Sequence, residues 1–124
     1  MRRRDEFERD PDAYATRWQP EEERLRRLIT AARRRLDKVV VSDEALEKAA
    51  RLCMALGTDG LRGELTLMRA ARAAAALEGA RAVGDAQLRR VAPAALRHRL
   101  RRNPLDEAGS TTRVERAMAD LFGA

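Results

Sequence analysis

The stretch GLRGELTLMRAARAAAALE, which runs from Gly60 to Glu78, decides the fold class of this 124-residue chain. Its apolar residues recur at the spacing of one helix face, and those expected to face a core are Leu61, Leu65, Met68, Ala71 and Ala75. The alanine run at 73–76 lets a neighbouring helix approach closely, and Gly79 can end the helix. The stretch therefore predicts a long helix that packs against other helices.

Comparable patterns precede this stretch. Asp10-Pro11 predicts the start of a short helix, because aspartate caps helices and proline is tolerated at the first position. Gln19-Pro20 predicts a restart or a kink, followed by a helix with the apolar row Leu25, Leu28, Ile29, Ala32 and Leu36. An extended connector at 39–41 then leads to Ser42, which can cap a helix with the row Leu46, Ala49, Ala50, Cys53 and Leu56 that ends at Gly57.

Two further helices are expected after Gly79. One spans about 85–100 and is bent by Pro93, with the row Leu88, Val91, Ala92, Ala95 and Leu96. The other is capped by Ser110, with the row Val114, Ala117, Met118, Leu121 and Phe122. Together these rows predict an all-α fold, a small bundle of about five helices.

The composition narrows the possible functions. The formal net charge is +6, but acids alternate with arginines, as in Glu21-Glu22-Glu23-Arg24, which favours solvated helix faces over a nucleic-acid-binding surface. Arg2-Arg3-Arg4 precedes acids rather than an apolar leader, and no run approaches the roughly 20 apolar residues of a membrane span. The lone Cys53 excludes an internal disulfide. We therefore expect a cytoplasmic protein with no membrane partner.

No pattern in the sequence predicts catalysis. A phosphate-binding loop of the form G-x-x-x-x-G-K-[ST] is absent. The segment 39–44 superficially resembles the strand and acids that hold Mg²⁺ in such ATPases, but a loop leading into a helix cap explains it better. His98 is the only histidine, so a zinc site is not expected. We expect a non-catalytic module that holds no metal.

Residues 59–64, Asp-Gly-Leu-Arg-Gly-Glu, break local helix rules. Arg62 falls in the first turn of the expected helix, where a cation opposes the helix dipole, and Gly63 costs about 1 kcal/mol relative to alanine. Broken rules often mark function, and Gly60 and Gly63 would leave backbone room around the guanidinium. From these residues alone, a ligand-binding arginine and an ordinary surface arginine stay equally open.

A second unusual stretch is 98–106, HRLRRNPLD. Its dense basic end could bind phosphates through His98, Arg99, Arg101 and Arg102. These side chains could instead complement the C-terminal dipole of their helix and pair with nearby acids. The residues alone favour this second interpretation.

Several segments, taken in order, resemble the C-terminal helical lid of the magnesium chelatase I subunit, an AAA+ ATPase. They are Arg2–Phe7 with Asp10-Pro11, Ala31-Ala32-Arg33, Gly57–Leu65, Ala74–Gly79, and His98–Asp106 with Gly109-Ser110-Thr111. The likeness covers nearly the whole chain and is densest from Leu56 onward.

The resemblance implies roles for particular residues. Arg62 matches the sensor 2 arginine, which reaches the phosphates of ATP between core and lid, and Asp59, Gly60 and Gly63 would form its supporting turn. The basic side chains of residues 98, 99, 101 and 102 would be interface or phosphate contacts. Residues 1–18 would be a lead-in segment from the AAA+ core, containing a short helix, and residues 19–124 the lid. We expect Tyr14 and Trp18 to anchor the lead-in segment to the bundle.

The resemblance also implies partners. The full subunit would use ATP and Mg²⁺, assemble into a homo-oligomeric ring and join a D subunit. The ring would drive the H subunit to insert Mg²⁺ into protoporphyrin IX, the committed step toward chlorophyll or bacteriochlorophyll. The phosphate loop, the Mg²⁺-holding acids and the arginine finger belong to the core, so this chain alone is expected to bind no cofactor and to hydrolyse no ATP.

Two alternatives remain open from the sequence. One is the lid of a cobalt chelatase or of another AAA+ remodeller. The other is a free-standing basic helical protein that binds nucleic acid, although the sequence has no recognisable helix-turn-helix and no aromatic stacking pattern.

Overall fold

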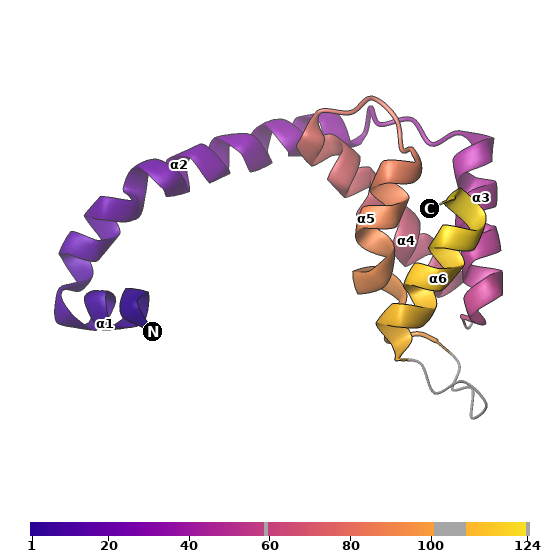
Figure 1. Cartoon of the computed structure of the whole chain (residues 1–124). Coiled ribbons are helices and arrows are strands. Elements are labelled where there is room, and N and C mark those ends of the chain that lie inside the picture. Colours follow the sequence, from indigo (N-terminus) through magenta and orange to yellow (C-terminus); the bar gives the residue numbers. More distant parts are fainter. Residues whose placement is uncertain (59, 101–108, 124) are drawn as a thin grey trace.

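The computed structural model describes residues 1–58, 60–100 and 109–123, and this part of the chain is all-α, as the sequence predicts. Its helices are α1 (Arg2–Arg9), α2 (Pro11–Leu36), α3 (Asp43–Leu56), α4 (Gly60–Glu78), α5 (Asp85–Leu96) and α6 (Ser110–Phe122). Helices α3 to α6 and the last turns of α2 form a compact body, and the rest of α2 extends away from it with α1 at the far end (Figure 1). Within the described ranges, no helix has the length and apolar character needed to cross a membrane.

Local capping chemistry sets most helix ends. The Asp10 side chain accepts a hydrogen bond from the Ala13 N–H at 3.2 Å, and the Ser42 hydroxyl accepts one from Ala45 at 3.1 Å. Gly57 ends α3 in the left-handed conformation, with φ of 64°. These three predictions are confirmed. The cap predicted for the last helix is wrong by one position, because Gly109 is the N-cap and Ser110 is the first helical residue.

Helix α2 is longer than predicted. It continues through Pro20 without a break, so the predicted restart there is wrong. Proline removes one hydrogen bond from a helix interior, and the remaining bonds of this long helix carry it across that position. The ribbon curves along its length rather than stopping (Figure 1).

The N-terminal aromatic residues pack within the extended part of the chain. The Phe7 ring meets Tyr14 edge-on at 5.7 Å between centroids, and Tyr14 lies 6.1 Å from Trp18. The Arg3 guanidinium stacks over Trp18 at 4.7 Å. The expectation that Tyr14 and Trp18 anchor this segment to the bundle is therefore wrong, since they hold α1 against α2. Helix α1 itself was not expected.

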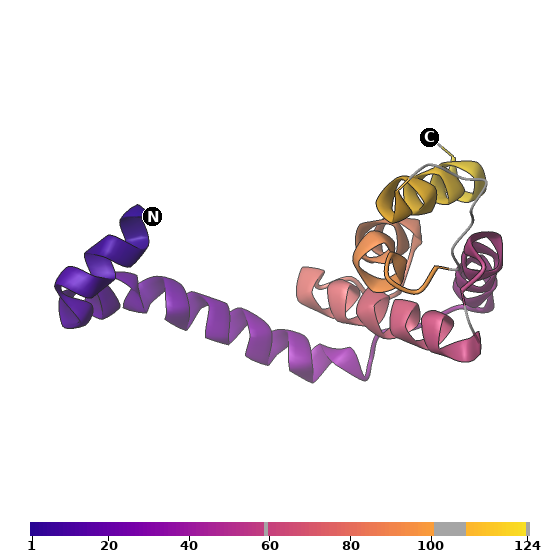
Figure 2. The ribbon, with the colours of Figure 1, turned by 90° about the horizontal axis from the view of Figure 1, so that it is seen from below.

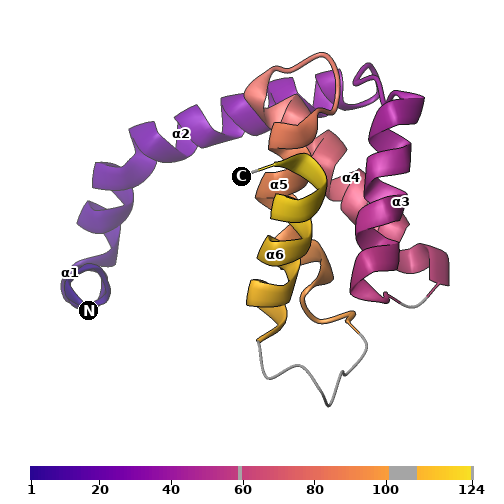
Figure 3. The same cartoon turned by 45° about the vertical axis from the view of Figure 1, so that its right-hand side comes forward.

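The core lies where α3, α4, α5 and α6 meet, and Figures 2 and 3 show these helices around it. Its largest fully buried side chains are Leu52, Leu67, Leu88, Leu96 and Val114. The extended connector is also confirmed: the Val40 N–H donates to the Arg81 carbonyl at 2.9 Å, and the Val83 N–H donates to Val40 at 3.0 Å. This backbone pairing joins the end of α2 to the loop between α4 and α5.

Helix α4 buries a different face from the predicted one. Met68, Ala71 and Ala75 are buried as expected, but Leu61 is 71% exposed and Leu65 52%. The buried positions of its first two turns are Gly63 and Leu67. Other residues predicted to be buried are also exposed, namely Leu25, Leu28, Ile29 and Leu46. Helix α5 ends at Leu96 instead of near residue 100, with Pro93 in its last turn.

The two leucines of α4 give a direct test of this orientation. Leu67→Ala should destabilise the chain by about 2–5 kcal/mol, because it opens a cavity in a fully packed core. The matched change Leu65→Ala should cost less than about 0.5 kcal/mol, because that side chain already faces solvent. Urea unfolding followed by circular dichroism measures both, and a reversed order would show that α4 is rotated differently.

Candidate functional site

The turn between α3 and α4 is built by backbone hydrogen bonds that return to the end of α3. The Gly57 N–H donates to the Met54 carbonyl at 3.1 Å, and the Thr58 N–H donates to the Cys53 carbonyl at 3.1 Å. The Thr58 hydroxyl also donates to Cys53, at 3.4 Å. The chain then opens α4 at Gly60, whose φ of 62° favours glycine. The predicted supporting residue Asp59 lies outside the described residues.

Gly63 is required by packing. A Cβ at this position would lie 2.9 Å from the Thr58 hydroxyl oxygen and 3.1 Å from the Thr58 Cβ. The space beside Gly63 is therefore filled by the preceding turn, and the hypothesis that it leaves room for a ligand is wrong. Gly60, by contrast, has no atom within 4 Å of its ideal Cβ position.

Arg62 lies exposed in the first turn of α4, and that turn contains no acidic residue. Among the described residues, its guanidinium has no hydrogen-bond or ion-pair partner. The helix dipole presents a partial positive charge at the same end. An anionic group that approached this turn would meet both the guanidinium and the dipole.

Leu61 and Leu65 are neighbours of Arg62 on the exposed face of α4. Residues one and four positions apart along a helix differ by about 100° and 40° in direction, so the three side chains share one side. Two large exposed leucines beside an exposed arginine are typical of a contact surface. Sequence reasoning missed this role because it assigned both leucines to the core.

Residues 97–100, the described part of the basic stretch after α5, lie at the same end of the bundle (Figure 3). Leu100 forms an isolated antiparallel bridge with Thr58, which places this segment beside the turn that precedes Arg62. His98 is exposed. The Arg99 Nε is buried and has no hydrogen-bond partner in the part of the chain that the structure describes. Arg101 and Arg102 lie outside the described residues.

Cys53 lies beneath this turn and is not a reactive group. Burial raises the pKa of its thiol, and the negative charge of Glu64 adds to the rise, while the hydrogen bond with Thr58 lowers it. The thiol is therefore neutral at physiological pH and a poor nucleophile. The described residues also contain no group of three or more side chains that could hold a metal ion. The arrangement can bind an anion or a protein surface.

Comparison with known proteins finds one matching domain family and several similar chains. The AAA lid domain family matches residues 46–118. The magnesium-chelatase 38 kDa subunits of Rhodobacter capsulatus and Acidiphilium rubrum are each 58% identical over 98% of this chain, which covers 35% of their length. A solved complex of the magnesium chelatase subunits BchI and BchD contains a chain 50% identical to this one, with a TM-score of 0.48 over 94% of this chain and 34% of that one. The chain thus spans about a third of the length of its relatives.

The contact between Gly63 and Thr58 predicts a double-mutant effect. Gly63→Ala should destabilise the chain by about 1–3 kcal/mol, because overpacking outweighs the gain in helix propensity of about 1 kcal/mol. In a Thr58→Ala background the same change should cost less, since the nearest atom is gone. Thermal unfolding of the four proteins gives the coupling. Strict additivity would mean that the two residues do not touch.

Proposed function

The chain belongs to the AAA lid domain family, and we propose that it works as the C-terminal lid of a magnesium chelatase ATPase subunit. In this role it couples ATP binding and hydrolysis in an AAA+ ring to insertion of Mg²⁺ into protoporphyrin IX, on the pathway to chlorophyll or bacteriochlorophyll. Support comes from the 58% identity to two magnesium-chelatase 38 kDa subunits. The resemblance seen in the sequence is confirmed at the level of the family.

The guanidinium of Arg62, which has no partner among the described residues, carries the proposal. Its position in the first turn of α4, with no acid in that turn, suits a group that donates charge-assisted hydrogen bonds to phosphate oxygens. The buried Nε of Arg99 is a second donor without a partner among the described residues. These features fit a nucleotide held mainly by another domain, since the chain has no phosphate loop of its own. The bound ATP and Mg²⁺ supply the phosphoryl chemistry in the complete subunit.

Leu61 and Leu65 supply the apolar part of the same contact. Their exposed side chains would pack against the AAA+ core when Arg62 reaches the phosphates. Burying them would exclude water around the guanidinium, and a charged hydrogen bond is stronger in such surroundings. Nucleotide binding would thus draw the lid and the core together, and loss of the terminal phosphate would weaken the contact.

Helix α2 is suited to carry this movement. Arg35 donates from Nε and Nη2 to the Ala76 carbonyl at 3.0 and 2.6 Å, and Arg72 donates to the Leu36 carbonyl at 3.3 Å. These reciprocal bonds tie the end of α2 to α4, so α4 and the last turns of α2 would move as one body. We place the lead-in segment at residues 1–18 and the lid at 19–124, a boundary that falls within α2. The lid would turn about the lead-in segment.

The partners follow from the same proposal. They are the AAA+ core of the same subunit, further copies in a homo-oligomeric ring, and the D and H subunits, all in the cytoplasm. Nucleic acid is not among them, because many surface arginines already face acids in exposed ion pairs. Examples are Arg4–Glu8, Arg24–Glu21 and Arg51–Glu47. This dispersed pattern differs from the continuous basic stripe of a nucleic-acid interface.

A chimera tests the central role of Arg62. In it, this chain replaces the matching third of the Rhodobacter capsulatus subunit. Arg62→Ala should lower ATP hydrolysis and chelation by about 10- to 150-fold, the equivalent of a lost charged hydrogen bond of about 1.5–3 kcal/mol. The melting temperature should not change, because the side chain is exposed.

Arg69→Ala is the matched control for this experiment, since Arg69 is an exposed arginine on the same side of α4. It should leave both activities within about twofold of the parent. Full activity in the Arg62 variant, or an equal loss in both variants, would show that Arg62 has no special contact with the nucleotide.

The absence of specific nucleic-acid binding is also testable. In a band-shift assay at physiological salt, the chain should show no sequence preference and only weak retention, because non-specific binding falls steeply with salt. A sequence-specific complex that survives about 150–200 mM salt would favour the nucleic-acid alternative.

A further inference from the structure

Helix α2 has an uncovered apolar stretch in the middle of one face. Near its start, Tyr14 and Trp18 are partly covered by α1, and near its end Ala32 is buried against the body. Between these two covered regions, the large apolar side chains that remain exposed are Leu25 at 48%, Leu28 at 38% and Ile29 at 50%. Such a row of large side chains left in water is typical of a surface that binds another protein.

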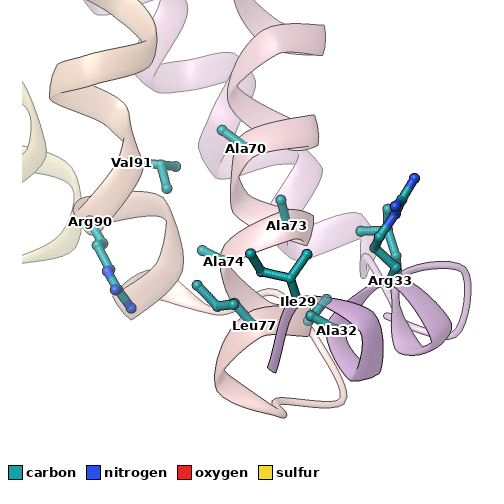
Figure 4. Close-up of a pocket in the computed structure, with 11 residues that line it drawn as sticks. Ile29, Ala32, Arg33, Ala70, Ala73, Ala74, Leu77, Arg90 and Val91 are labelled. Carbon is teal, nitrogen blue, oxygen red and sulfur yellow. The ribbon is translucent and has the colours of Figure 1, made fainter. Parts of the chain in front are cut away.

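This stretch continues into an apolar groove of about 520 Å³ between α2, α4 and α5. Leu36 is among its lining residues. Figure 4 shows Ile29, Leu77 and Val91 around the groove, with alanines of α4 between them. Small residues let a helix backbone approach closely. Arg33 and Arg90 also line the groove, and Arg90 is paired with Glu78, so Arg33 is the cation left to a partner on this boundary.

The charges on α2 indicate what fills the groove. Glu22 and Arg33 are separated by about three helical turns and point in directions that differ by only about 20°, so they lie on the same flank of the apolar row. Arg33 has no ion-pair partner among the described residues, and Glu22 has only Arg26, at 3.9 Å. The apolar row is thus flanked by a negative charge at its N-terminal end and a positive charge at its C-terminal end.

We propose that the groove receives the α2 helix of a second copy of this chain in antiparallel orientation. In this arrangement Leu25, Leu28 and Ile29 of the two copies meet about the symmetry axis, and Leu25 of each copy lies beside the groove of the other. Glu22 of one copy then lies beside Arg33 of its partner, and the symmetry creates this pair twice. A parallel arrangement would place Glu22 beside Glu22. The contact is isologous and closes as a dimer, and it is independent of any role for Arg62.

Sedimentation equilibrium of the 124-residue chain over a wide concentration range tests the pairing. The apolar surface is small, so a weak, concentration-dependent monomer–dimer equilibrium is expected. Ile29→Asp should abolish the dimer and leave the circular dichroism spectrum unchanged, because Ile29 is half exposed. Leu46→Asp is the matched control, since Leu46 is 48% exposed and lies outside the groove, and it should leave the dimer intact.

A charge exchange tests the antiparallel orientation. Glu22→Arg and Arg33→Glu should each weaken association by about three- to tenfold, and the double variant should return to within about twofold of the original chain. A chain that stays monomeric up to about 1 mM would overturn the proposal. So would a dimer that is insensitive to Ile29→Asp, or a double variant no better than the single ones. If the groove instead binds a helix of another protein or an AAA+ core, the isolated chain will stay monomeric.

Discussion

Thr58 lies so close to Gly63 that a Cβ there would approach its hydroxyl oxygen to 2.9 Å, and the rotation of α4 about its axis follows from this contact. With Gly63 turned toward the preceding turn, Leu67, Ala71 and Ala75 are directed into the core. The opposite side of the same turns carries Leu61, Arg62 and Leu65 into solvent. One close backbone approach therefore sets both what is buried and what is presented, and glycine is the residue that permits it.

The second organising feature is the attachment of α2. Side chains of Arg35 and Arg72 cross between α2 and α4 and donate to carbonyls near the helix ends, each of which also accepts a bond from a backbone N–H just beyond its helix. The connector at 39–41 adds backbone pairing to the loop before α5. Helix α2 is therefore fixed to the bundle at its C-terminal end and carries a small aromatic cluster at its N-terminal end. Any force on the N-terminal segment would reach α4 directly.

The sequence predicted well wherever local chemistry decides the structure. Caps at Asp10 and Ser42 and the stop at Gly57 depend on neighbouring residues and are correct. It failed where two local patterns compete. In the first two turns of α4, Leu61 with Leu65 and Gly63 with Leu67 are equally regular pairs, and the structure buries the second pair, with Gly63 packed against Thr58. The position of Arg62 was predictable, whereas its leucine neighbours on the surface were not.

The central claim is that the exposed face around Arg62 closes on a nucleotide-bearing core. Thiol labelling of a Leu65→Cys variant of the chimera tests it most directly, since the native Cys53 is buried. Labelling should be rapid without nucleotide and should slow by about tenfold or more with a non-hydrolysable ATP analogue, because a covered side chain reacts only when the contact opens. An unchanged labelling rate, with the analogue shown to be bound, would contradict the account.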